Sequence, residues 1–298
     1  MKLPACIPVW LCCLCVSMSM TAAAQESIFK VLMTQGVVEG QKPGTKTWFR
    51  VYPTVELPSY TKIRLAANAY ATFISSESVL VEYDKKGSYE LKPTKKAKNI
   101  SSLQKISNFV NQAMKTGPQA DLVGSIVRNA GAVKVHFPFD TKVLTPTVTL
   151  QWHADKAENF EVKLTDERGI VVYSKKLRDT ALTLNLSSDI REFKRGVCYY
   201  WSVSNSSLAS SGSAPACIMY LDEDEALRLD RERTQLKEEV DFSPSKALSW
   251  YILGAWYEDR KLYSAALESY STCMKLHPTV DIYKNAVKNF LEKFQTTK

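Results

Sequence analysis

The segment from Ala247 to Val280 constrains the fold more than any other part of the chain. It predicts two helices joined by a turn at residues 259–261, with Pro278 ending the second helix. Apolar or small residues recur at helical spacing along one face of each helix: Trp250, Leu253, Gly254 and Tyr257 on the first, and Ala266, Tyr270 and Cys273 on the second. Because Gly254 and Ala266 are small, the helices can approach closely where they cross, and aromatic rings can fill the space beside them.

These residues resemble a tetratricopeptide repeat (TPR), whose pattern is Trp, Leu-Gly, Tyr, Ala, Phe, Ala and Pro at fixed offsets. Tyr270 stands in place of Phe and Cys273 in place of the second Ala, while the other positions match. Such repeats bind partners and do not transform substrates, so the resemblance implies a protein-binding role. It also implies an inner surface formed by the first helix of each pair, which would carry Tyr251, Glu258, Asn285 and Asn289.

Tyr251 is the favoured anchor for a partner, since exposed aromatic residues often dominate interfaces. Ordinary solvent exposure, or contact with a neighbouring helix, is the competing interpretation of all four residues. Further helices are predicted after Asp222 and between Ile282 and Phe294, so that a TPR-like helical region would span 222–298. Roughly three repeats are normally needed to bury a continuous core. The flanking helices must therefore act as caps, or another chain must, which leaves oligomer formation open.

The N-terminus predicts a secretory signal peptide over residues 1–24. Lys2 precedes an apolar stretch from Ile7 to Met20, and three alanines lie before Gln25. A membrane anchor is the alternative, but the apolar stretch is short for a span, and no later stretch is apolar enough to cross a bilayer. We therefore expect an exported protein, in the periplasm or at the cell surface of a Gram-negative bacterium.

The chain carries 39 basic and 31 acidic side chains, a formal net charge of +8. Much of the excess lies between Lys85 and Lys115, where lysines occur without the arginines typical of nucleic-acid sites. We therefore expect no nucleic-acid partner. A solvated connector is the main interpretation of this segment, and contact with a glycan or another anionic surface is the alternative.

Residues 25–92 show the alternation and glycine-containing turns of a small β domain. The runs Ala69–Ile74 and Val79–Tyr83, followed by Lys86-Gly87-Ser88-Tyr89, resemble the β-rich domain of FecR-type envelope proteins. FecR signalling proteins join this domain to an inner-membrane span and a cytosolic tail, neither of which we expect here, so the resemblance suggests a fold and leaves any signalling role open. Residues 93–131 predict a helical bridge, in which Leu103, Ile106, Phe109, Val110 and Ala113 keep helical spacing.

Residues 132–221 return to strand patterns, with seven short alternating segments that fit a β-sandwich. The segments around Leu150-Gln151-Trp152, Phe160-Glu161-Val162 and Arg168-Gly169 resemble fibronectin type III or immunoglobulin-like modules of bacterial envelope proteins. Cys198 and Cys217 lie in two runs that would form a hairpin. With its midpoint near Ser207 and Leu208, the hairpin would place the two cysteines directly opposite each other. This predicts a disulfide, and two free buried thiols are the alternative. The fold class is thus multidomain α+β.

Motifs for catalysis are not found in the sequence. The three histidines, His136, His153 and His277, lie in separate contexts without metal-ligand spacing, and no nucleophile elbow, phosphate-binding loop or dinucleotide fingerprint occurs. We therefore expect no enzyme, cofactor or metal site. The leading hypothesis is an interaction scaffold that binds another envelope protein through the helical region. The alternative is a carbohydrate- or surface-binding protein that recognises its ligand through the β domains.

Overall fold

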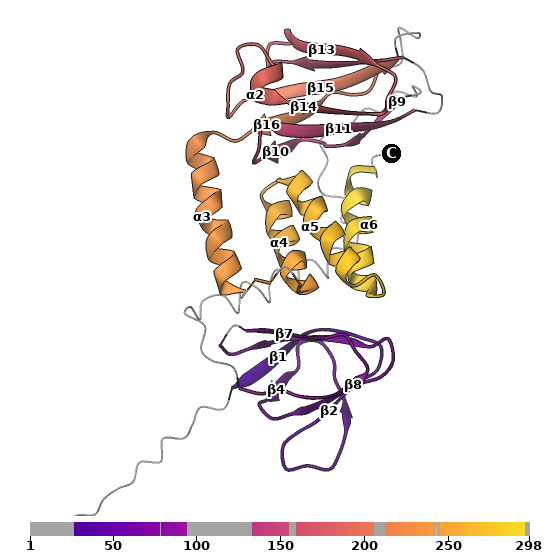
Figure 1. The fold of residues 1–298 in the computed structure, drawn as a ribbon, viewed down its shortest axis with the longest axis vertical. Coiled ribbons are helices and arrows are strands. Elements are labelled where there is room, and N and C mark those ends of the chain that lie inside the picture. The colour runs from indigo at the N-terminus through magenta and orange to yellow at the C-terminus, as the bar shows by residue number, and fades with distance from the viewer. Residues whose placement is uncertain are drawn as a thin grey trace, which may run out of the picture.

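The computed structural model describes residues 27–77, 79–93, 133–154, 159–205, 212–240, 242–243 and 245–295. It combines several β-sheets with helices, so the expected mixed α+β class is confirmed. Figure 1 shows an N-terminal β unit at one end, helices α3 to α6 in the middle and a second β unit at the other end. The predicted signal peptide and nearly all of the predicted helical bridge lie outside the described residues. Among the described residues, no helix is long and apolar enough to cross a membrane.

The N-terminal β unit contains two four-stranded antiparallel sheets. One has the order β4-β1-β6-β7, formed by β4 (Glu56–Pro58), β1 (Ile28–Gln35), β6 (Tyr70–Ser75) and β7 (Leu80–Tyr83). The other has the order β3-β2-β5-β8, formed by β3 (Phe49–Arg50), β2 (Val38–Gln41), β5 (Lys62–Leu65) and β8 (Gly87–Glu90). Their facing side chains form one core.

Strand β6 is buried along its whole length, because its sheet is covered on both faces. Ala71 and Phe73 point into the core of the β unit, whereas Tyr70 and Ile74 belong to the core of the helices. Strand β5 on the other sheet shows the predicted alternation, with Ile63 and Leu65 buried and Lys62 and Arg64 exposed. The first sheet therefore faces the helices, and the second sheet faces outward.

The second β unit is a two-sheet sandwich. Its smaller sheet has the order β14-β11-β9, formed by β14 (Ala181–Asn185), β11 (Thr147–Ala154) and β9 (Val133–Phe137). Its larger sheet has the order β10-β16-β15-β12-β13, formed by β10 (Thr141–Val143), β16 (Ala216–Tyr220), β15 (Cys198–Asn205), β12 (Phe160–Thr165) and β13 (Val171–Leu177). Trp152, Phe160 and Trp201 lie in the shared core. A one-turn helix, α2 (Leu186–Asp189), is capped by the Asn185 side chain.

Four longer helices follow: α3 (Glu223–Glu239), α4 (Ala247–Asp259), α5 (Tyr263–Leu276) and α6 (Asp281–Gln295). The Asp222 carboxylate accepts a hydrogen bond from the Glu225 amide at 2.8 Å, which caps α3 as its acidic start suggests. Gly254 of α4 lies against the ring of Tyr270 on α5. A Cβ at residue 254 would be 2.7 Å from two carbons of that ring, so the helices pack this closely only with glycine there.

Candidate functional site

Tyr251, the predicted partner anchor, is buried. Its side chain is 2% exposed, and its ring lies 5.8 Å from the ring of Tyr270 and 5.7 Å from the ring of Tyr283. The prediction of an exposed aromatic on an open inner surface is therefore wrong. The cause is α6, whose Tyr283 covers the face of α4 that a partner would have contacted.

Glu258 joins three helices. The Tyr270 hydroxyl donates a hydrogen bond to Glu258 Oε2 at 2.7 Å, and Lys293 of α6 forms an ion pair with Glu258 Oε1. Its carboxylate is thus engaged inside the stack. Asn285 is exposed on α6 and Asn289 is half-buried there. The four residues predicted to form one surface are therefore split between the interior of the stack and the outer side of α6.

The residues of the TPR-like pattern occupy packing positions. Leu253, Gly254, Tyr257, Ala266 and Tyr270 are buried, and Cys273 is a buried free thiol. The Trp250 ring is half-buried and meets the edge of Phe242 at 5.1 Å between centroids. Pro278 is exposed, two residues beyond the end of α5.

One end of the helical stack is joined to the N-terminal β unit. The Gln35 side chain donates to the Thr279 carbonyl at 3.0 Å and accepts from the Asp281 amide at 2.7 Å, at the start of α6. The Lys246 ammonium, before α4, donates to the Leu80 carbonyl at 3.3 Å. These contacts attach β1 and β7 to the turns at that end of the stack.

A buried polar cluster lies beside those contacts. Glu82 of β7 accepts hydrogen bonds through Oε1 from His277 Nε2 at 2.9 Å and from the Tyr70 hydroxyl at 2.7 Å. The hydroxyls of Tyr70 and Tyr283 are hydrogen-bonded to each other. The hydrogen bond to Glu82 raises the pKa of His277 above 6.5, against the opposing effect of desolvation. We call Tyr70, Glu82, His277 and Tyr283 the junction cluster. Sequence analysis missed it, since its members lie far apart in the chain.

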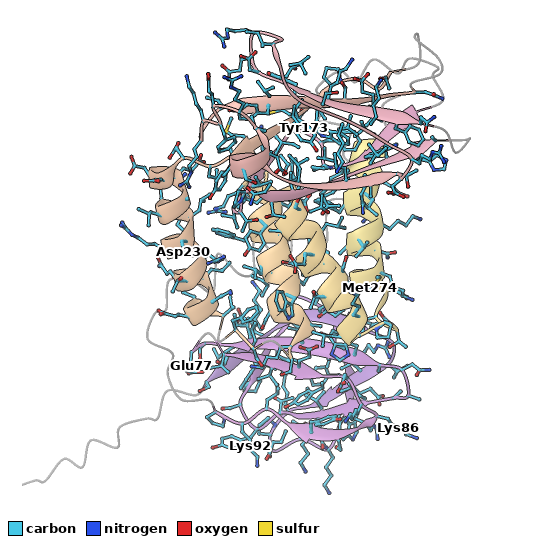
Figure 2. All side chains as sticks on the ribbon, turned by 45° about the horizontal axis from the view of Figure 1, so that its top comes forward. Glu77, Lys86, Lys92, Tyr173, Asp230 and Met274 are labelled. Atoms are coloured by element: carbon cyan, nitrogen blue, oxygen red, sulfur yellow. A yellow bond between two sulfur atoms is a disulfide. The ribbon has the colours of Figure 1, made fainter. Side chains whose placement is uncertain are left out.

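The other end of the stack is joined to the sandwich. The turn between α4 and α5 meets β10, where the Lys142 amide donates to the Lys261 carbonyl at 2.9 Å. The Thr141 hydroxyl bonds to the same carbonyl at 3.1 Å, and the Tyr263 amide lies 3.1 Å from the Thr141 oxygen. The Lys142 ammonium pairs with Glu225 of α3 at 2.7 Å. The helices are therefore attached to a β unit at each end, as Figure 2 shows with the side chains drawn.

Alkaline pH is expected to destabilise this arrangement. Burial raises the pKa values of Tyr70, Tyr251, Tyr270 and Tyr283. Above about pH 10 the unfolded chain loses these protons while the folded chain keeps them, so stability falls as pH rises, by up to about 1.4 kcal/mol per pH unit for each tyrosine. Urea midpoints at pH 8 and pH 11 measure this loss. Tyr283→Phe should make the fall shallower, and equal wild-type midpoints at the two pH values would contradict the expectation.

The predicted disulfide between Cys198 and Cys217 is confirmed, with a Cα–Cα distance of 5.7 Å. The register differs from the prediction, because Cys198 is paired with Met219 and Cys217 with Tyr200. The bond thus joins diagonal positions of β15 and β16.

Removing the disulfide should destabilise the sandwich. The bond closes a loop between residues 19 apart, and opening it should cost about 3 kcal/mol by the chain-entropy account. Thermal unfolding of the protein, with and without reductant, tests this. The Cys198→Ser, Cys217→Ser double variant should match the reduced protein. A midpoint that reductant leaves unchanged would show that the bond contributes no stability.

A hollow of about 730 Å³ lies on the sandwich near the disulfide. It is formed by the β12–β13 turn and the loop before β15, and its lining mixes aliphatic and charged side chains, including Ile170, Val197, Arg191 and Glu192. Asp166 at its edge accepts from the amides of Arg168 and Ile170 and pairs with the Arg168 guanidinium, so that carboxylate is already engaged. Within the described residues, no group of three or more His, Cys, Asp or Glu side chains could hold a metal ion.

Comparison with known proteins adds little. No protein-family profile matches the chain, and no curated protein is significantly similar to it. One solved structure, the FN1–FN3 domains of chicken CNTN1, shares 12% identity over 66% of this chain and 56% of that chain, with a TM-score of 0.21. A beta-1,2-glucanase from Parabacteroides distasonis shares 10% identity over 84% of this chain and 38% of that chain, with a TM-score of 0.22. Neither similarity assigns a family or an activity.

Proposed function

We propose that the protein is an exported, non-enzymatic interaction scaffold of a Gram-negative cell envelope. A TPR-like helical stack holds a FecR-like β unit and a fibronectin- or immunoglobulin-like sandwich at a set spacing. The observation that carries this proposal is the attachment at both ends of the stack, through Gln35 and Thr279 at one end and Thr141 and Lys261 at the other. The disulfide is compatible with an oxidising compartment outside the cytoplasm.

The partner would be another envelope protein, bound on the outer side of α6. Because Tyr251 and Glu258 are engaged inside the stack, Asn285 and Asn289 are what remains of the predicted contact set. Asn285 lies between Lys284, which pairs with Asp281, and Lys288, which pairs with Glu292. A surface of amides and mutually paired charges is polar without a strong net charge, which suits a hydrogen-bonding protein partner.

Crosslinking in the native envelope, followed by purification of the mature chain, tests the proposal. Asn285→Arg should reduce the crosslinked partner by tenfold or so if it removes about 1.4 kcal/mol of binding. Thr234→Arg is the matched control, since Thr234 is also exposed on a helix but lies on α3. Equal recovery of the partner with both variants would rule out the α6 surface.

A second candidate function, binding of an acidic glycan, is supported by the outward sheet of the N-terminal β unit. The Arg64 guanidinium stacks over the Trp48 ring at 4.3 Å and pairs with Glu39 at 2.8 Å. Arg50 is the neighbour of Glu39 on β3, and Lys62 is exposed on β5. Aromatic rings beside cations suit a sugar ring that carries a negative charge.

Calorimetry with alginate, an acidic polysaccharide, tests this second function. Wild type should bind, and Trp48→Ala should weaken the binding severalfold. Tyr200→Ala is the control, because Tyr200 is a partly exposed aromatic residue on the sandwich, which this function does not involve. If wild type does not bind, or if the two variants lose affinity equally, the outward sheet is not the site.

A further inference from the structure

The junction cluster lies where two separately built parts of the molecule meet. Glu82 comes from β7, on the side of the N-terminal β unit that faces the helices (Figure 1), and His277 follows α5 directly. Their side chains are 10% and 18% exposed, so the ion pair is largely shielded from solvent. A charge pair in such a place interacts more strongly than a surface pair, but it also leaves a costly charge behind when one partner becomes neutral.

Few hydrogen-bond donors stabilise the Glu82 carboxylate. Its Oε1 accepts from His277 and Tyr70, whereas its Oε2 is buried without a hydrogen-bond partner. Thr72, directly opposite Glu82 on β6, also has a buried hydroxyl oxygen without a partner. Since the second carboxylate oxygen is unsatisfied, the negative charge of Glu82 relies heavily on the positive charge of His277.

The other groups around the pair do not replace that positive charge. On the β unit, Tyr70 bonds to Glu82, and Asp84 Oδ2 lies 3.8 Å from His277 Nδ1. On the helices, Tyr283 bonds to Tyr70, and the Cys273 thiol lies near Glu82 with its pKa raised by burial. The Lys246 ammonium is directed at the Leu80 carbonyl. Two carboxylates, Glu82 on β7 and Asp84 just after it, thus face His277, and both favour its protonated form.

We infer that the Glu82–His277 pair is a proton-controlled clasp, which holds the N-terminal β unit firmly on the helical stack when His277 is protonated and less firmly when it is neutral. This inference concerns attachment within the chain, so it stands independently of which partner or glycan the protein binds.

The contacts determine how the strength of the attachment changes with pH. Glu82 raises the pKa of His277 in the folded chain above the ordinary value of 6.5. The stabilising contribution of the pair is therefore fully present below pH 6.5, and it is lost as pH rises through the raised pKa. Neutral His277 can still donate one hydrogen bond to Glu82, so we expect weaker attachment at higher pH and not complete release.

The Asp281 amide reports the state of the junction directly, because it donates to Gln35 across the boundary. Its hydrogen exchange in the mature chain should be compared between wild type and His277→Gln at each pH from 5.5 to 9, which cancels the intrinsic pH dependence of exchange. At low pH the wild-type amide should exchange severalfold more slowly than the variant. This ratio should fall as pH rises, by about tenfold for each unit by which the folded pKa exceeds the unfolded one.

Two further variants complete the test. Glu82→Gln keeps a similar side-chain shape and should remove the pH dependence of the exchange ratio. In this variant the pKa of His277, followed by NMR, should return toward 6.5. If His277→Gln does not fold, Glu82→Gln takes its place in the exchange comparison. His153→Gln, on β11 of the sandwich, should leave the wild-type profile unchanged. A flat exchange ratio across the pH range, or a His277 titration at or below 6.5 in wild type, would overturn the inference.

Discussion

Tyr251→Ala is expected to lower the free energy of unfolding by about 3–5 kcal/mol, the usual loss when a large buried aromatic side chain is truncated. The reason is the position of the ring, which is 2% exposed between Tyr270 and Tyr283. Truncation would leave a cavity where α4, α5 and α6 meet. Chemical denaturation of the protein, monitored by circular dichroism, measures the loss.

Two variants act as controls for Tyr251→Ala. Tyr251→Phe keeps the ring and should cost less than about 1.5 kcal/mol. Tyr60→Ala removes a tyrosine that is 55% exposed and should stay within about 0.5 kcal/mol of wild type. If Tyr251→Ala behaved like Tyr60→Ala, α6 would not cover α4, and the open inner surface expected from the TPR resemblance would be restored.

Gly254→Ala is expected to destabilise the protein by about 1–3 kcal/mol, as overpacking usually does. Alanine is the better helix former by about 1 kcal/mol, so helix propensity alone predicts the opposite sign. Packing should prevail because the new Cβ would be 2.7 Å from two carbons of the Tyr270 ring, and that ring is held by its hydroxyl bond to Glu258.

A double-mutant cycle isolates the clash. Tyr270→Leu alone should be destabilising, because it creates a cavity and removes the hydroxyl that donates to Glu258 Oε2. In that background Gly254→Ala should become nearly neutral or stabilising, since the ring carbons are gone. Additive losses in the double variant would show that the cost at residue 254 does not come from contact with Tyr270.

Local patterns predicted the strands and helices well where one face is buried and the other exposed. Ile63 and Leu65 on β5 alternate as expected, and the seven segments assigned to the second β region are all strands. Short strands without a clear alternation were missed, including β2, β4 and β10. Strand β10 pairs in parallel with β16, and local sequence patterns do not predict such a long-range contact.

The location of Tyr251 could have been anticipated in part. Helix α4 buries residues around its whole circumference, among them Leu248, Tyr251, Ile252 and Trp256. A helix that is apolar on all sides is normally enclosed, so its composition argued against an open groove beside it. The junction cluster could not be anticipated, because Glu82 and His277 come together only when the β unit docks on the helices.

The central claim is that the helical stack holds the two β units in one fixed arrangement. Spin labels at Ser88→Cys on β8 and Lys176→Cys on β13, both exposed and at opposite ends of the molecule, allow the distance between the units to be measured by pulsed electron resonance. Cys273 is buried and should stay unlabelled. We predict one narrow distance distribution for the protein in solution. A broad distribution, or several separate distances, would contradict the account.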